Sequence, residues 1–215
     1  NNIVTIQPDS LRILHNPLTG WVLYASMGVD AADFWAQYDH MYIPELGHNV
    51  SVTDYAHTLY IRASWTDFNP QEDVYGWKID SNLRAYIEGA YQRNMRLAFR
   101  VVVDSRDKRT EFTPQFVKDA GAKGFMNKGK WSPYSDDPVF QKYYTKFVKA
   151  LAKDFNDPSK VEFIDGFGLG KWGEYHTMIY STGDDTPKKA VFNWVTDIYS
   201  QAFDKVPVVI NYHRW

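Results

Sequence analysis

Residues 57–65 read HTLYIRASW, residues 79–93 read IDSNLRAYIEGAYQR and residues 96–103 read RLAFRVVV. The outer two stretches are short and rich in β-branched and aromatic residues, which predicts strands. The middle stretch predicts a helix that Asp80 or Ser81 can cap, because apolar side chains recur in it at helical spacing. A strand, a helix and a second strand in this order predict two parallel strands joined by a crossover.

The same alternation extends along the chain in both directions. Further strands are predicted over residues 21–26, 161–169 and 207–212, and further helices over residues 137–154 and 187–203. Pro138 suits the first turn of its helix, and Thr186 is a candidate cap for the last helix, with Pro187 at the first helical position. No repeat or low-complexity linker interrupts the pattern, so we expect residues 1–215 to belong to one domain.

Five strands that alternate with helices fit two architectures. One is a five-stranded open sheet, and the other is the first part of a (β/α)8 TIM barrel, which needs about 250 residues. We favour the barrel, with this chain as its N-terminal part. The last five residues, Asn211 to Trp215, are polar and aromatic, as expected in the middle of a site. In both architectures the site lies at the C-terminal ends of the strands.

Composition excludes several classes of protein. The formal net charge is −2, with a pI of about 6.3, which argues against a nucleic-acid partner. No apolar stretch approaches the roughly 18 residues of a membrane span. The chain has no cysteine, no metal-ligand spacing of histidines, no Gly-x-Ser-x-Gly elbow and no phosphate-binding glycine fingerprint after its first strand. We therefore expect no metal and no cofactor.

Aromatic residues are unusually frequent, at 17% of the chain, and they include 8 Trp. Sugar-binding clefts use flat rings that stack on pyranose faces, and protein-interaction surfaces use such residues too. A large core filled by aromatic side chains explains the same number. Composition alone leaves these three explanations open.

Two arginines fall on the less apolar face of their strands. Alternation places Arg62 with Tyr60 and Ser64, and Arg100 with Ala98 and Val102. Both guanidinium groups are then expected to point into a barrel interior or a cleft, either as structural ion pairs or as ligands of a substrate. A buried arginine needs an acidic partner, and the candidates are Asp104, Asp165 and Glu174. The mixed-charge run at residues 106–109 is interpreted as a solvated loop.

The loop after the fourth predicted strand contains the residues best suited to chemistry. It reads Gly168-Leu-Gly-Lys-Trp-Gly-Glu-Tyr-His176. Its glycines allow close approach of a ligand, Trp172 offers a stacking face, and Glu174 is a carboxyl among aromatic rings that can act as a general acid. The alternative is that Glu174 pairs with Lys171 or an arginine and only holds the loop. His176 can bind a substrate, orient Glu174 or stabilise the loop.

The stretch after the second predicted strand resembles a known family. It is similar to the corresponding segment of β-galactosidase-like (β/α)8 barrels, which belong to the large retaining clan of glycoside hydrolases. The matching positions are Trp65, Pro70, Tyr75, Trp77, Asp80 and Arg100, while Asp73 stands where the family usually has Gly. The opening Asn16-Pro17-x-x-Gly20-Trp21 and the segment around Glu174 also resemble a bacterial glycosidase-like group with a Gly-x-Trp-Gly-Glu-[WY]-His signature. The resemblance covers about residues 16–176.

This resemblance implies specific roles. In that clan the acid/base glutamate follows the fourth strand, where this chain has Glu174. An asparagine usually precedes that glutamate and contacts the sugar, but here the residue is Gly173. The nucleophilic carboxylate follows the seventh strand, beyond the five strands of this chain.

The leading hypothesis is a glycoside hydrolase that acts on an oligosaccharide or polysaccharide by a two-carboxylate mechanism. Glu174 is its general acid/base, and the predicted substrate-binding residues are Arg62, Trp65, Arg100, Trp172, His176, Asn211 and His213. One alternative is a carbohydrate-binding barrel without turnover, favoured by Gly173. Another is an aromatic-rich protein-interaction domain. For an enzyme acting on polymeric glycans we expect export from a bacterial cell, with a signal peptide already removed; the oligomeric state stays open.

Overall fold

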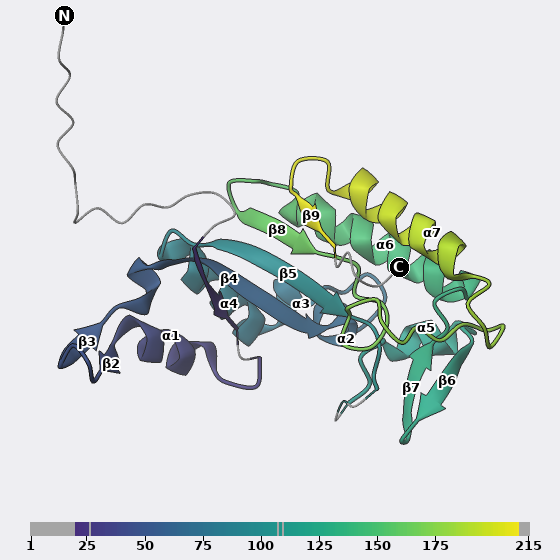
Figure 1. Ribbon diagram of the computed structural model, residues 1–215, viewed down its shortest axis with the longest axis horizontal. Coiled ribbons are helices and arrows are strands. Elements are labelled where there is room, and N and C mark those ends of the chain that lie inside the picture. Colours follow the sequence, from purple (N-terminus) through teal and green to yellow (C-terminus); the bar gives the residue numbers. More distant parts are fainter. Residues whose placement is uncertain (1–19, 26, 107, 109, 211–215) are drawn as a thin grey trace, which may run out of the picture.

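The computed structural model describes residues 20–25, 27–106, 108 and 110–210. Five parallel strands form one sheet in the order β1-β4-β5-β8-β9 (Figure 1). Their bounds are β1 Trp21–Tyr24, β4 Ala56–Ser64, β5 Arg96–Val102, β8 Val161–Asp165 and β9 Val208–Val209. The five strands and the parallel sheet predicted from the sequence are confirmed.

The predicted crossover between β4 and β5 is present. Helix α4 (Ser81–Gln92) connects the two strands, and Asp80 caps it by accepting a hydrogen bond from the Leu83 amide at 2.6 Å. The strands pair in register from Thr58 beside Arg96 to Ser64 beside Val102. This register sets Arg62 directly beside Arg100, so the sheet carries two neighbouring positive charges on one face.

The other two predicted helices also form. Helix α6 (Pro138–Phe155) begins with its proline in the first turn, and the Asp137 side chain accepts from the Phe140 amide at 2.8 Å. Helix α7 (Lys188–Ala202) differs at its start. Pro187 occupies the cap position and no side chain caps the helix, so the prediction of Thr186 as the cap is wrong.

All five strands end earlier than predicted, and two of these ends bear on the site. Strand β8 ends at Asp165 rather than at residue 169, because the chain then enters a loop in which Gly168 and Gly170 adopt left-handed backbone angles. Strand β4 ends at Ser64, whose side chain caps the short helix α2 (Trp65–Phe68), so Trp65 begins a helix and does not end a strand. Residue 26 of the predicted first strand and residues 211–212 of the predicted fifth strand lie outside the described part.

Several short elements were not predicted. They are helices α1 (Ala31–Asp39), α3 (Gly76–Ile79) and α5 (Gln115–Asp119), the 3-10 helix η1 (Val52–Asp54), and two hairpins, β2 (Met41–Ile43) with β3 (His48–Val50) and β6 (Gly124–Asn127) with β7 (Lys130–Pro133). Within the described residues, no helix is both long and apolar enough to cross a membrane.

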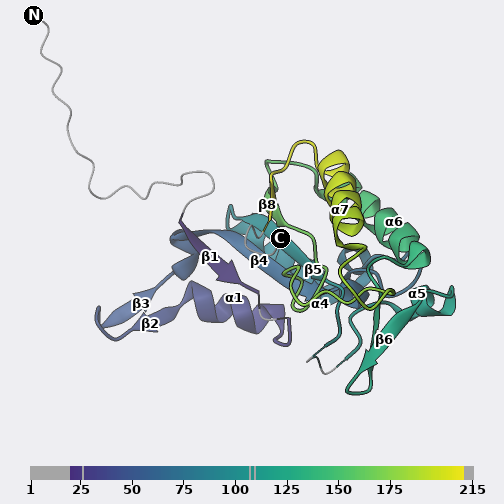
Figure 2. The same cartoon turned by 45° about the vertical axis from the view of Figure 1, so that its right-hand side comes forward.

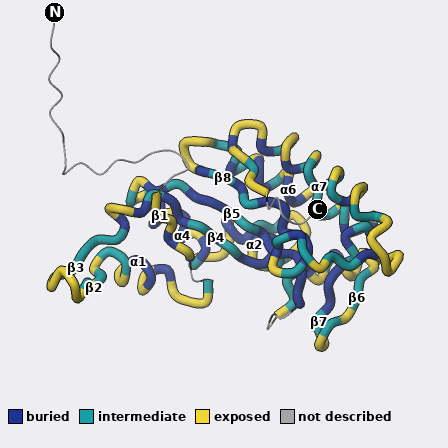
Figure 3. Tube along the Cα trace, viewed as in Figure 1, coloured by how far each residue is buried: buried dark blue, intermediate teal, exposed yellow. Residues whose placement is uncertain are grey.

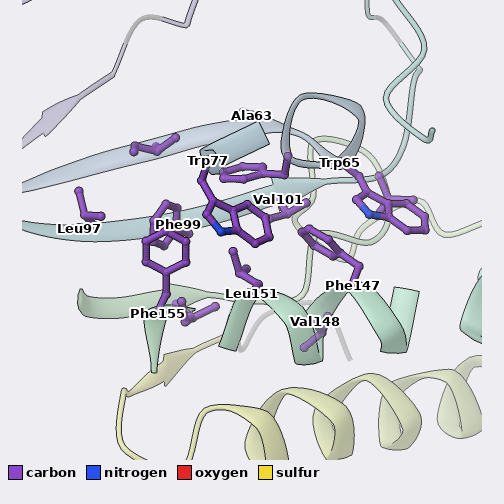
Figure 4. Close-up of a cluster of buried hydrophobic side chains, with 14 of the residues drawn as sticks. Ala63, Trp65, Trp77, Leu97, Phe99, Val101, Phe147, Val148, Leu151 and Phe155 are labelled. Atoms are coloured by element: carbon purple, nitrogen blue, oxygen red, sulfur yellow. The ribbon is translucent and has the colours of Figure 1, made fainter. Parts of the chain in front are cut away.

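The core lies between the sheet and helix α6 (Figure 4). Ile61 and Phe99 of the sheet are fully buried, and so is Leu151 of the helix. Trp65 is buried too, with rings of Phe116, Phe140, Tyr144 and Phe147 around it. Much of the unusual aromatic content therefore fills the core.

Within the described residues, no helix covers the opposite face of the sheet (Figures 1 and 2). Tyr24 on this face remains 52% exposed, and Tyr60, Arg62 and Arg100 are only half-buried. Figure 3 shows β4 and β5 as largely buried, with positions of intermediate burial between the buried ones. A (β/α)8 barrel keeps its helices outside and this face inside, so the described strands form an arc of such a barrel.

Candidate functional site

The site lies on the open face of the sheet, around the side chain of Arg100. One terminal nitrogen of the guanidinium lies 2.6 Å from Asp165 Oδ2. The Nε atom donates to the same oxygen at 2.9 Å. Its other terminal nitrogen donates to Glu174 Oε1 at 3.1 Å. Asp165 also accepts from the Tyr60 hydroxyl at 2.6 Å. One cation thus joins two carboxylates from β8 and from the loop that follows it.

This network confirms two of the three predicted acidic partners. Arg100 pairs with Asp165 and Glu174, as expected from strand phase. The third candidate, Asp104, is wrong as a partner for the strand arginines because it pairs with Arg106. Arg106 is only 9% exposed, so the interpretation of residues 106–109 as a solvated loop is wrong at its first position.

The network fixes the protonation of its two donors. Burial and the Asp165 carboxylate together raise the pKa of Tyr60 far above its usual range, so its hydroxyl keeps its proton. Burial alone would lower the pKa of Arg100, but the neighbouring Asp165 and Glu174 carboxylates outweigh burial and raise it. Both groups therefore act as permanent hydrogen-bond donors.

The loop between β8 and α7 has an unusual backbone. Seven of its residues have left-handed φ angles, namely Gly168 (75°), Gly170 (72°), Trp172 (62°), Gly173 (74°), Tyr175 (56°), Thr177 (47°) and Gly183 (77°). Three of them are not glycine, and such residues persist only where the surroundings fix them. Backbone bonds do so here, because the Tyr175 amide donates to Leu169 at 2.8 Å and the Lys171 amide to His176 at 3.0 Å.

Gly173 has a steric reason to be glycine. Its φ is +74°, and a Cβ at this position would lie 3.2 Å from the Val102 side chain and 3.4 Å from Cδ of Arg100. A side chain here would press against the arginine that holds Glu174. An asparagine at this place would need these neighbours to move by a few tenths of an ångström.

Glu174 is partly open to solvent, with 28% of its side chain exposed. Its Oε1 is held by Arg100, and its Oε2 lies 4.0 Å from Nε2 of His176. The His176 ring meets the Trp172 ring edge to face at 5.2 Å, and Lys171 Nζ lies 4.7 Å from the Trp172 ring centre. Trp172 itself is 39% exposed. A carboxyl, an imidazole and an open indole therefore meet in one loop.

The remaining predicted site residues lie in three different places. Arg62 is close to the site, but it donates to the backbone carbonyl of Trp172 at 2.7 Å. Trp65 is buried in the core, so its predicted role in stacking on a sugar is wrong. Asn211 and His213 lie outside the described residues. In the described part of the chain, no group of three or more His, Asp or Glu side chains could hold a metal ion.

No protein family model matches the chain, and no curated protein matches it in sequence. Solved structures do match. The chain is similar to GH5_18 from Streptomyces cattleya in complex with GlcNAc, with a TM-score of 0.54 and 13% identity over 88% of this chain and 43% of that one. A variant of GH5_18 from Streptomyces cattleya in complex with Manβ1-4GlcNAc gives a TM-score of 0.53 and 13% identity, over 86% and 40%.

A third structure, an exo-β-1,4-mannosidase from Opitutaceae bacterium strain TAV5, gives a TM-score of 0.47 with 14% identity, over 74% of this chain and 25% of that one. The chain thus spans between 25% and 43% of the length of these three structures. At such low identity the two better matches show the fold alone, which is part of the (β/α)8 barrel found in glycoside hydrolases.

Proposed function

We propose that this protein is a glycosidase that cleaves O-glycosidic bonds with Glu174 as general acid/base. The observation that carries the proposal is the position of Glu174 in an open loop after the fourth strand of the sheet, with one oxygen bound by Arg100. In barrels of this kind, active sites lie at the C-terminal ends of the strands. An exposed tryptophan two residues away adds a surface suited to a sugar ring.

The chemistry assigned to Glu174 is proton transfer to the leaving oxygen and back from water. Arg100 fixes Oε1, so Oε2 is the atom that exchanges the proton. The mechanism needs a second carboxyl, about 5–5.5 Å away for retention or about 6.5–9.5 Å for inversion. Asp165 is already engaged by Arg100 and Tyr60. In this proposal the second carboxyl comes from a barrel strand beyond the five described.

The substrate in this proposal is an oligosaccharide or polysaccharide, and the enzyme acts outside the cytoplasm. The experiment is incubation of the protein with a panel of oligosaccharides, followed by quantification of released reducing sugars. We expect release from at least one member of the panel. Saturable binding by calorimetry without any release would contradict turnover and would support the non-catalytic carbohydrate-binding barrel. A result with no binding and no release would contradict both the glycosidase and the non-catalytic carbohydrate-binding barrel.

Trp172→Ala should weaken binding of the hydrolysed sugar by about 5- to 10-fold. The indole offers stacking area that alanine cannot replace, and an aromatic contact contributes roughly 0.5–1.5 kcal/mol. Calorimetric titration of both proteins measures the difference. Trp21→Ala is the matched control, because Trp21 is 75% exposed but sits at the amino end of β1, away from the loop. Equal losses in the two variants would contradict the role of Trp172.

A further inference from the structure

A buried ion pair lies beside the site and takes no part in the proposed proton transfer. Asp104 is 6% exposed and Arg106 is 9% exposed. The Arg106 side chain donates from Nε to both Asp104 oxygens, at 3.0 and 2.8 Å, and from a terminal nitrogen to Oδ2 at 2.5 Å. The Arg106 amide also donates to Asp104 Oδ1 at 2.8 Å. The carboxylate therefore fixes the direction of the guanidinium.

The same terminal nitrogen of Arg106 also reaches the loop that carries Glu174. It donates to the backbone carbonyl of Thr177 at 2.7 Å. On the other side of Glu174, Arg62 donates to the carbonyl of Trp172, also at 2.7 Å. Both carbonyls belong to left-handed residues that are not glycine, with φ of 47° at Thr177 and 62° at Trp172. Two charged donors thus hold the strained backbone on either side of Glu174.

The pair also connects the loop to a more distant element. The Ser132 hydroxyl of β7 donates to Asp104 at 3.3 Å and accepts from the Ser105 amide at 2.8 Å. The Arg106 guanidinium lies 5.4 Å from the ring centre of Phe125 in β6. The β6–β7 hairpin and the loop that carries Glu174 therefore both contact the same buried guanidinium.

We infer that Arg106 is a positioning residue, which with Arg62 holds the backbone of residues 171–177 so that Glu174 faces Arg100. The catalytic part of this inference rests on the proposed role of Glu174. A buried ion pair contributes little net stability compared with apolar side chains of the same volume, so its main effect here is geometric. Only a guanidinium has the planar fork that can serve a carboxylate and a carbonyl together.

Arg106→Lys tests the inference by hydrogen exchange, which needs no substrate. The ammonium keeps the charge beside Asp104 but cannot reproduce both contacts. We expect amide exchange in residues 171–177 to become at least about 10-fold faster, while exchange in α4 and α6 stays unchanged. The His176 ring signals in NMR spectra should shift as well, because that ring lies between Glu174 and Trp172. The control is Arg84→Lys, in the exposed pair with Glu88.

Unchanged loop exchange in Arg106→Lys would overturn the inference, and so would equal acceleration throughout the protein, which indicates a general loss of stability. Should this variant not fold, Arg62→Lys tests the other contact, because Arg62 lies on the open face. Faster exchange confined to residues 171–174 is expected there, and no change would overturn the inference.

Measurement of turnover then separates the positioning role of Arg106 from the catalytic role of Glu174. On a hydrolysed sugar, Arg106→Lys should lower kcat by about 10-fold or more while KM stays within about twofold, because a displaced acid impairs the reaction more than binding. If Glu174 proves not to be catalytic, faster exchange in the loop still supports the positioning role of Arg106. If Glu174 is catalytic and the loop is unaffected by Arg106→Lys, only the positioning role of Arg106 is refuted.

Discussion

Glu174→Gln should lower the rate of glycoside hydrolysis by about 1,000-fold, because glutamine cannot supply a proton to the leaving oxygen. Glutamine has nearly the same shape, and its side-chain oxygen can still accept from Arg100 Nη1, which lies 3.1 Å from Oε1 in the native site. Arg100 also keeps its contacts with Asp165. We therefore expect the variant to fold and to bind the sugar with little change in Kd. Initial rates of sugar release and calorimetric titration measure the two quantities.

The matched control is Glu88→Gln, on the exposed face of helix α4, where Glu88 pairs only weakly with Arg84 at 3.2 Å. This change removes one negative charge far from the loop, so its rate should equal that of the native protein. A Glu174→Gln variant with native turnover would rule out Glu174 as the acid/base. Loss of folding together with activity would instead indicate that Glu174 only holds the loop.

Gly168→Ala should destabilise the protein by about 3 kcal/mol or more. The added methyl group would lie 1.8 Å from the Val101 carbonyl oxygen and 2.8 Å from the Tyr144 hydroxyl. It cannot be accommodated by side-chain rotation, because the nearest atom belongs to the backbone of β5. Gly168 also accepts from the Val103 amide at 3.0 Å, so any displacement breaks a contact that continues the sheet. Urea unfolding followed by circular dichroism measures the free energy.

Gly183→Ala separates the steric effect from the backbone effect. Gly183 has φ of +77°, close to the +75° of Gly168, but a Cβ there would meet nothing within 4 Å. The change should cost only about 1 kcal/mol, the usual penalty for a left-handed alanine. Equal losses at the two positions would contradict the close packing of the Glu174 loop against β5.

The parallel sheet was predictable because its strands and helices obey local rules. The alternation along β5 predicted that Arg100 would leave the core, and its need for a counter-charge pointed to Asp165 and Glu174. The cap at Asp80 and the place of Pro138 in the first turn of α6 followed from residue type and position. These features depend on short stretches of sequence whose physical preferences agree with the fold.

Other features depend on contacts between distant segments, which no local pattern records. Trp65 looked suited to stack on a sugar, but the aromatic side chains of α6, 75 or more residues later, bury it. Arg106 stood in a mixed-charge run, and its burial depends on the Thr177 carbonyl and on the β6–β7 hairpin. The hairpins themselves have strands of only three or four residues, too short for a periodic signal.

The most direct test of Glu174 as the general acid compares two aryl glycosides of the hydrolysed sugar that differ only in the leaving group. A phenol of high pKa needs a proton to depart, while a dinitrophenol departs without one. A general acid role predicts that Glu174→Gln slows the first substrate by about 1,000-fold and the second by about 10-fold or less. The same deficit with both leaving groups would contradict proton donation by Glu174.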